Sequence, residues 1–180
     1  MFGIVLPITG AAETAIQAIW VELAQAFDLH IQPSLPHVSL HIAPEYDAAA
    51  LRPVAAQFAR TWPPFTLTTS GLGLFTVPEP VLYVAVTCGR DLLDCHVHLH
   101  PLAEPFAQAS VPYYQPGRWV PHITLAHGPR LQSCLPDVIR LLGGRDYNWS
   151  IPVTQIAFIN NPLTTHEIWG FQGQLPVTSS

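Results

Sequence analysis

LPHVSL, residues 35–40, is the stretch that decides the fold, because it recurs as VPHITL at residues 120–125. Each copy places a proline before a histidine and a hydroxyl-bearing residue two positions after it. Side chains at i and i+2 project from the same face of an extended strand. We therefore predict two β-strands, one in each half of the chain, and each presents a His–hydroxyl pair: His37 with Ser39, and His122 with Thr124.

Helical and strand patterns alternate around the two copies. Helical spacing of apolar residues predicts helices over 13–27, 48–62, 92–109 and around 138–142. Besides the motif strands, 36–42 and 119–126, strand patterns cover 2–8, 65–75, 81–86, 151–159 and about 167–175. This order predicts an α+β protein, a bilobal duplicated α/β unit whose two antiparallel sheets flank a central cleft. Residues 1–180 would form a single domain with two pseudo-symmetric lobes and one motif in each.

The amino-acid composition and net charge indicate which kinds of molecule the protein could bind. Hydrophobic residues make up 49% of the chain and charged residues 11%, as in a globular protein rather than a disordered one. The net charge is −5 and all seven basic residues are arginines scattered along the chain, so a small phosphate ester fits better than long RNA or DNA. No apolar run is long enough to span a membrane, and the N-terminus lacks the positive region of a signal peptide. We expect a cytoplasmic monomer with reduced cysteines.

The paired motifs carry a family likeness. Two His-x-(Ser/Thr)-hydrophobic motifs, each preceded by proline, resemble those of the 2H phosphoesterase superfamily, and most closely its 2'-5' RNA ligase-like and RNA 2',3'-cyclic phosphodiesterase members. The mid-chain segments 73–75 and 81–86 are similar to the strand pair of that family. The resemblance implies a bilobal fold and phosphodiester chemistry without a metal. By position, His37 and His122 would be the acid–base pair, and Ser39 and Thr124 would hold the phosphate oxygens.

Elementary chemistry leads to the same roles. Hydrolysis of a 2',3'-cyclic phosphate needs water deprotonated on one side and the leaving alkoxide protonated on the other. Imidazole, with an ordinary pKa of about 6.5, can do either near neutral pH. The hydroxyls can donate hydrogen bonds to the charge that develops on the non-bridging oxygens. The sequence does not assign which histidine is the base.

The chain departs from the family at one position. Many relatives place an arginine three residues after the second hydroxyl, where this chain has His127. A titratable ring would then replace a fixed guanidinium that binds phosphate bidentately. Arg130, just beyond it, or Arg118, just before the strand, could compensate for that change. The aromatic residues Tyr113, Tyr114 and Trp119 precede the second motif and could stack a nucleobase or simply pack a loop.

Other histidines have competing interpretations. Strict alternation puts His41 on the face of His37 and Ser39, where it extends the cleft wall or lies in water at the strand's outer end. The run Cys95-His-Val-His-Leu-His100 could bind a metal if it were a strand. On the helix expected here only His96 and His100 stack at i and i+4, so a solvated face or a lobe interface is the favoured interpretation. We expect no cofactor and no metal.

The leading hypothesis is a metal-independent phosphodiesterase that hydrolyses a 2',3'-cyclic phosphate or a similar small nucleotide phosphodiester. Its partners would be a small nucleotide or an RNA-terminal cyclic phosphate, with neither membrane nor long nucleic acid. The substrate-binding residues would be Ser39, Thr124, His127, Arg130 and Tyr113. Two main rivals remain: 2'-5' RNA ligation, which is the same chemistry reversed, and a non-catalytic nucleotide-binding module that uses the same cleft. A metal-binding protein built on residues 95–100 is the third and least favoured rival.

Overall fold

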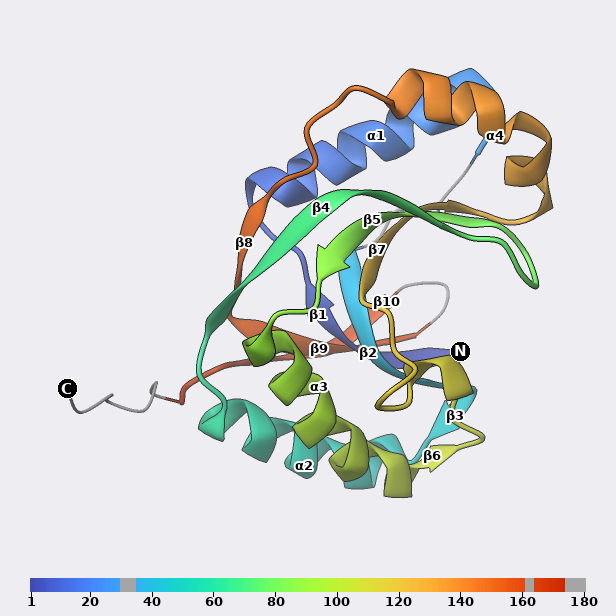
Figure 1. Cartoon of the computed structure of the whole chain (residues 1–180). Helices are drawn as coiled ribbons and strands as arrows, with labels where there is room; N and C mark the ends of the chain where they lie inside the picture. The colour runs from blue at the N-terminus through green and yellow to red at the C-terminus, as the bar shows by residue number, and fades with distance from the viewer. Residues whose placement is uncertain (30–34, 161–163, 174–180) are drawn as a thin grey trace.

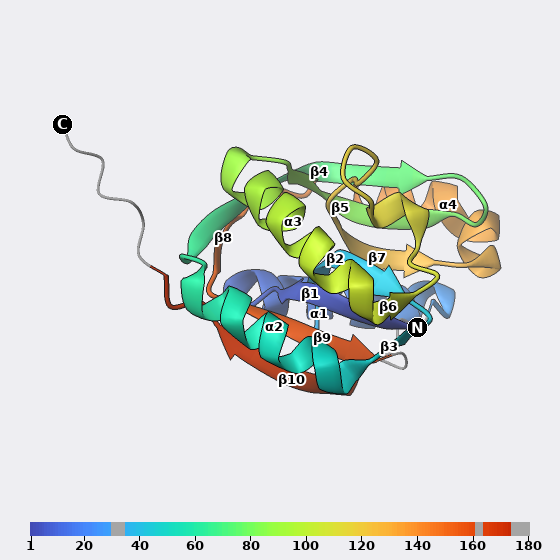
Figure 2. The same cartoon turned by 90° about the horizontal axis from the view of Figure 1, so that it is seen from below.

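Two antiparallel four-stranded sheets form the framework of the protein in the computed structural model, which describes residues 1–29, 35–160 and 164–173 (Figures 1 and 2). The first sheet has the order β10 (Thr164–Gly170), β9 (Gln155–Asn160), β1 (Phe2–Pro7) and β2 (His37–Ala43). The second has the order β7 (His122–His127), β5 (Val81–Thr87), β4 (Phe65–Phe75) and β8 (Ser150–Val153). The α+β class and the two antiparallel sheets expected from the sequence are confirmed.

Each sheet is covered by two helices (Figure 1). Helices α2 (Ala48–Thr61) and α3 (Arg90–Ala103) pack together on the first sheet, against β10 and β2. Helices α1 (Ala11–Phe27) and α4 (Pro129–Leu142) contact each other and β7 of the second sheet. Short elements lie at one end: the strand pair β3 (Glu45–Tyr46) and β6 (Ala107–Gln108), and the 3-10 turns η1 (Glu104–Phe106) and η2 (Pro112–Tyr114). No helix among the described residues has the length and hydropathy to cross a bilayer.

The sheets do not correspond to the two halves of the sequence. The first sheet combines β1 and β2 from the start of the chain with β9 and β10 from its end, and α1 crosses over to the second sheet. The single strand predicted over 151–159 is wrong. It is divided at Thr154, whose carbonyl accepts a 2.7 Å hydrogen bond from the Phe171 amide, and its two parts join different sheets. A continuous apolar run does not reveal such a transfer, because both parts are equally suited to a buried strand.

The predicted helix over 92–109 is also too long. Helix α3 ends at Ala103 and continues as the turn η1, in which Pro105 cannot donate a helical hydrogen bond, before the chain becomes extended in β6. The last strand predicted to reach about residue 175 ends at Gly170, and 174–180 lie outside the described residues.

The motif strands are the edge strands of their sheets, and they contact each other. The leucine that ends each motif, Leu40 or Leu125, is fully buried in one core cluster that spans both sheets. This apolar packing brings one copy of the repeated hexapeptide beside the other, which positions the candidate site.

Candidate functional site at the paired histidine motifs

The two motif histidines are held by the same local hydrogen bond. Nδ1 of His37 lies 2.8 Å from the carbonyl oxygen of Leu35, and Nδ1 of His122 lies 2.8 Å from that of Val120. A carbonyl only accepts, so in each neutral ring Nδ1 carries the proton and Nε2 keeps a free lone pair. The proline before each histidine accepts a hydrogen bond at its carbonyl oxygen. Pro36 accepts from the Ile8 amide, and Pro121 accepts from the Val86 amide.

A β-bulge lies at the same place in both motifs. In β2, Ser39 pairs with Val5 and His41 with Ile4, which leaves Leu40 as the extra residue. In β7, Thr124 pairs with Tyr83 and Ala126 with Leu82, which leaves Leu125. Each bulge therefore reverses the alternation of faces directly after the hydroxyl-bearing residue.

The bulge in β7 decides where His127 points. Opposite residues of an antiparallel pair share a face, so His122, Thr124 and His127 lie on one face, with Ala85, Tyr83 and Val81 as their partners. Strict alternation would have put Ala126 there instead. His127 is exposed, and its counterpart in the first motif is Ile42.

The bulge in β2 shows that both positions predicted for His41, on the cleft wall or in water, are wrong. His37 and Ser39 share one face of the strand, whereas His41 lies on the opposite face, completely buried against α3. Its ring centroid is 4.6 Å from that of His100. His41 therefore neither extends the wall beside His37 nor lies in water.

A tryptophan caps each motif strand from outside its sheet. Trp119 Nε1 donates to the Ser39 carbonyl at 2.9 Å, and Trp20 Nε1 donates to the Thr124 carbonyl at 3.2 Å. Because β2 and β7 are edge strands, carbonyls on their outer sides have no strand to accept from. Neither indole was expected from the sequence, since Trp119 lies in the segment before β7, far along the chain from its acceptor, and Trp20 lies in α1.

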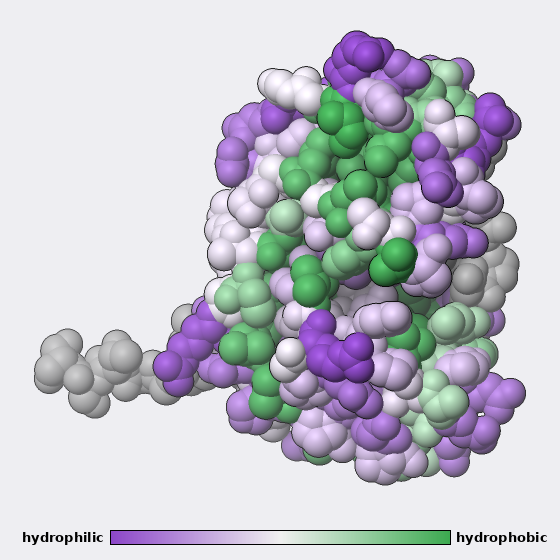
Figure 3. All heavy atoms as spheres, turned by 45° about the vertical axis from the view of Figure 1, so that its right-hand side comes forward, coloured by the Kyte–Doolittle hydropathy of each residue, from purple (hydrophilic) through white to green (hydrophobic). Residues whose placement is uncertain are grey.

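The surroundings of the two hydroxyls and rings differ. Ser39 is buried and its side chain hydrogen-bonds that of Tyr114, whereas Thr124 is half-buried. The His122 ring packs edge-on against Phe75, at 5.0 Å between centroids, and against Tyr83 at 5.2 Å. Figure 3 turns the right-hand side of Figure 1 forward, where hydrophobic side chains form a band between hydrophilic margins.

Burial lowers the pKa of both His37 and His122 from the ordinary value, because the charged ring loses water. The hydrogen bond from each Nδ1 to its carbonyl opposes this shift. A charge on His122 lowers the pKa of His37 further, so the two rings are close enough to interact. One ring that is protonated therefore favours the neutral form of the other, as a general acid and a general base require.

Two other predicted site residues, Arg130 and Tyr113, contact neighbouring residues, and their part in binding a substrate stays a prediction. Arg130 Nε donates to the Phe27 carbonyl at 2.9 Å and lies 3.6 Å from an Asp28 carboxylate oxygen, so its guanidinium is engaged at the end of α1. Tyr113 is 61% exposed, with the Arg118 guanidinium 5.6 Å from its ring centre. Its neighbour Tyr114 is the tyrosine that reaches Ser39.

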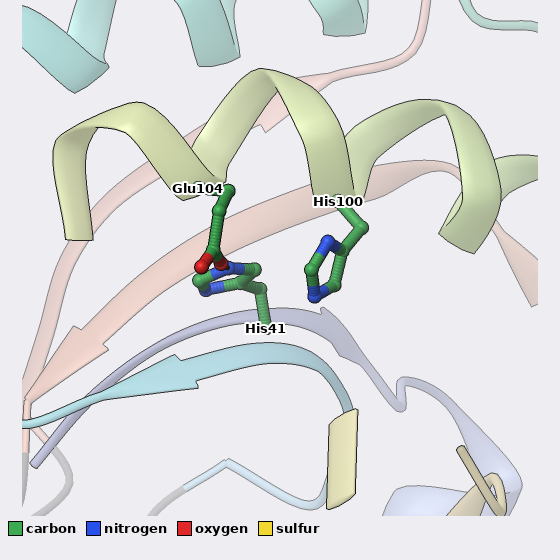
Figure 4. A group of neighbouring side chains, drawn as sticks. All are labelled: His41, His100 and Glu104. Atoms are coloured by element: carbon green, nitrogen blue, oxygen red, sulfur yellow. Dashed lines mark hydrogen bonds and ion pairs between the residues drawn. The ribbon is translucent and has the colours of Figure 1, made fainter. Parts of the chain in front are cut away.

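The histidines of α3 form an interface rather than a solvated face. His96 and His100 are buried and only His98 is exposed. His96 stacks on Trp119 at 4.0 Å between centroids, and its Nε2 donates to the Tyr114 carbonyl at 2.8 Å. Among the described residues, a set that could hold a metal ion is His41, His100 and Glu104, shown in Figure 4. It lies behind β2, on the face opposite to His37 and Ser39.

The sequence and the fold of this chain resemble those of known proteins. A sequence model of the 2'-5' RNA ligase superfamily matches residues 8–163. No curated protein matches the chain. Among solved structures, E. coli LigT in its apo form has a TM-score of 0.61 and 18% identity, with 96% of this chain and 97% of LigT covered.

Two other structures have the same fold at low identity. A protein described as a phosphoesterase has a TM-score of 0.61 and 20% identity over 96% of this chain and 98% of its own. TT0787 of Thermus thermophilus has a TM-score of 0.57 and 14% identity over 97% of this chain and 99% of its own. E. coli LigT has also been solved with 3'-AMP and with NADP+.

Proposed function

Because the chain belongs to the 2'-5' RNA ligase superfamily of 2H phosphoesterases, we propose that it is a phosphodiesterase that opens a 2',3'-cyclic phosphate or a similar small nucleotide phosphodiester. The observation that carries the proposal is the matched pair of His37 and His122. Each donates from Nδ1 to a carbonyl two residues earlier, which leaves the Nε2 lone pair for proton transfer. Each also shares its strand face with a hydroxyl.

The proposed mechanism uses the two rings in opposite protonation states. Nε2 of the neutral ring takes a proton from water, which attacks phosphorus, while Nε2–H of the protonated ring donates to the departing ribose oxygen. The Leu35 and Val120 carbonyls hold the rings and stabilise the imidazolium that forms. Thr124 and Ser39 donate to the non-bridging oxygens, for which the Ser39 hydroxyl turns away from Tyr114. The two imidazoles supply both acid and base, so these steps need no metal.

The nucleotide part of the substrate is supported by aromatic side chains beside His122. Phe75 and Tyr83 lie 4.4 Å apart between ring centroids, and each contacts the His122 ring, so a base or ribose could pack on them. The LigT structures with 3'-AMP and NADP+ support small nucleotides as the ligand class. His127, on the same face, is the proposed further phosphate contact, and the monomeric cytoplasmic state stays a prediction.

One assay tests the proposal. The pure chain is incubated with nucleoside 2',3'-cyclic phosphates in EDTA, alongside His37→Ala, His122→Ala and the exposed control His98→Ala. General acid–base catalysis contributes about 10²–10⁴-fold, so each motif variant should lose at least that much in kcat while the control keeps it. Full activity in either motif variant contradicts the proposal.

The same assay separates the rival functions. Turnover of a cyclic phosphate by water supports hydrolysis, whereas joining of an RNA 5'-hydroxyl end to a 2',3'-cyclic phosphate end supports ligation. Binding of 3'-AMP without turnover of any of these substrates supports a non-catalytic nucleotide module. His127 at the usual arginine position is the feature that favours this last rival.

A further inference from the structure

A second cluster of ionisable groups lies behind β2, outside the proposed catalytic pair. It consists of His41 on the back face of the strand, His100 on α3 and Glu104 at the end of that helix (Figure 4). One potential ligand atom from each lies within 4.8 Å of the others. His41 is completely buried and His100 is 8% exposed, while the Glu104 side chain is 45% exposed.

We propose that His41, His100 and Glu104 bind one divalent transition-metal ion, with Zn²⁺ the best match, at a three-ligand site that links α3 and η1 to the back of the first motif strand. The site uses none of the residues of the proposed phosphodiesterase mechanism. Metal binding at this site can therefore be tested independently of the proposed phosphodiesterase function.

The donor set suits zinc. Two imidazole nitrogens and one carboxylate oxygen form a known three-ligand set, with water in the fourth position. Zinc binds such donors at about 2.0–2.2 Å, which sets tetrahedral ligands about 3.3–3.6 Å apart. The three ligand atoms already lie within 4.8 Å, so small side-chain rotations bring them to that spacing. The exposed Glu104 gives an ion a path from solvent.

Outer hydrogen bonds orient two of the three ligands. His41 Nδ1 hydrogen-bonds the Tyr46 hydroxyl, and Ser110 Oγ donates to Glu104 Oε1 at 2.7 Å. Such bonds turn a ring nitrogen or a carboxylate oxygen toward a metal and hold it there. They leave His41 Nε2 and Glu104 Oε2 facing each other at 2.8 Å in the interior of the cluster.

The competing explanation is a plain histidine–carboxylate hydrogen bond. In that state His41 Nε2–H donates to Glu104, and the Tyr46 hydroxyl donates to Nδ1. Metal binding needs the Nε2 lone pair, so the ring proton moves to Nδ1 and the Tyr46 oxygen becomes its acceptor. His100 decides between the two explanations, because the hydrogen bond does not use it and the metal site does.

The experiment uses the full, untagged chain, stripped with EDTA and dialysed. Zn²⁺ is titrated in competition with a chromogenic chelator, and Co²⁺ is added separately so that tetrahedral coordination is read from its visible absorption. The variants are His100→Gln and Glu104→Gln, with His98→Gln as the matched control on the exposed side of α3. Tyr46→Phe tests the outer hydrogen bond.

One Zn²⁺ should bind per chain and raise Tm in the original chain and in His98→Gln. His100→Gln and Glu104→Gln should lose that binding and the Tm shift, and Tyr46→Phe should weaken binding by about 10–100-fold. Glu104→Gln is half-exposed and keeps its shape, so its folding is readily checked by circular dichroism. Absence of stoichiometric binding, or equal binding by Glu104→Gln, overturns the proposal.

Discussion

The indole Nε1 of Trp119 donates a 2.9 Å hydrogen bond to the carbonyl oxygen of Ser39, and Trp20 does the same for Thr124 at 3.2 Å. Each tryptophan thus holds the backbone of the residue whose hydroxyl is proposed to bind phosphate. The two indoles come from different elements, the segment between η2 and β7 and helix α1, so the caps arise from packing and not from the repeated hexapeptide. Both hydrogen bonds reach the motif strands from outside their sheets.

Trp119→Phe and Trp20→Phe should each lower the free energy of unfolding by about 1–2 kcal/mol, because a partly buried carbonyl loses its donor. Urea denaturation measures this loss. Trp62→Phe is the control, since Trp62 stacks on Phe58 and its indole makes no hydrogen bond among the described residues. If Trp119→Phe or Trp20→Phe is as stable as Trp62→Phe, the hydrogen bond of that indole contributes little to the free energy of unfolding.

The pH dependence of kcat/KM should be bell-shaped, with its maximum below about pH 6.5. The free enzyme needs one neutral and one protonated ring, and burial lowers the pKa of both His37 and His122, so the midpoint between the two falls on the acid side. The profile of kcat should peak at a higher pH, because a bound phosphodiester anion favours the protonated ring. A maximum of kcat/KM above about pH 7 would contradict the shared burial effect.

Gly73→Ala should disturb His122 indirectly. A Cβ at Gly73 would overlap the Tyr83 ring, and Tyr83 packs on His122. Forcing that ring aside should cost about 1–3 kcal/mol of stability and lower kcat as well. Gly170→Ala is the strand-glycine control, because a Cβ there would come no closer than 4.0 Å to another atom. Equal behaviour of the two variants would mean that the Tyr83 ring moves freely.

His127→Arg should lower KM for a cyclic phosphate about tenfold, since a charge-assisted hydrogen bond contributes about 1.5–3 kcal/mol. The bulge at Leu125 puts position 127 on the face of His122 and Thr124, from which a guanidinium can reach the phosphate. His98→Arg adds the same charge on α3 and should leave KM unchanged. Steady-state kinetics that show no difference between the two would remove position 127 from the site.

Acid should destabilise the fold through His96. Burial lowers the pKa of His96 to about 4, because the charged ring would lose its contact with water. The unfolded chain takes up this proton near about pH 6.5, so the contribution of a neutral His96 is complete above that pH and declines as the pH falls toward the folded-state pKa. The loss at this residue between about pH 7 and pH 5 should be about 2 kcal/mol.

His96→Phe keeps the stacking on Trp119 and cannot titrate, so its unfolding free energy should fall less over that pH range than that of the original chain. Urea denaturation at both ends of the range measures the difference. The buried His41 and His100 and the partly buried His37 and His122 also have lowered pKa values and act in the same direction, so the variant removes part of the acid sensitivity. An unchanged pH dependence would contradict the assignment to His96.

Several features of the fold were predictable because they depend on residues close in sequence. Helical spacing of apolar residues marked α1 and α2, and the period-2 patterns marked β4 and β5. The proline before each histidine and the hydroxyl two residues later predicted an extended strand with both side chains on one face. The pairing of β2 with β1 and of β7 with β5 confirms this. Whether those side chains catalyse a reaction stays a prediction.

Other features depend on partners that are distant in the chain. The bulges at Leu40 and Leu125 exist only relative to β1 and β5, so alternation along one strand put His41 on the wrong face. The transfer of the chain between sheets at Thr154 depends on the amide of Phe171, which no local pattern signals.

By itself, therefore, the sequence determined which residues form the two His–hydroxyl strands and that these strands belong to an antiparallel α+β protein. Only the tertiary structure decided that the strands lie edge to edge, that Trp20 and Trp119 cap them, and that His41 joins His100 and Glu104 behind β2. The reason is physical: side-chain periodicity is a property of one strand, whereas register, bulges and caps are set by hydrogen bonds that a strand makes with others.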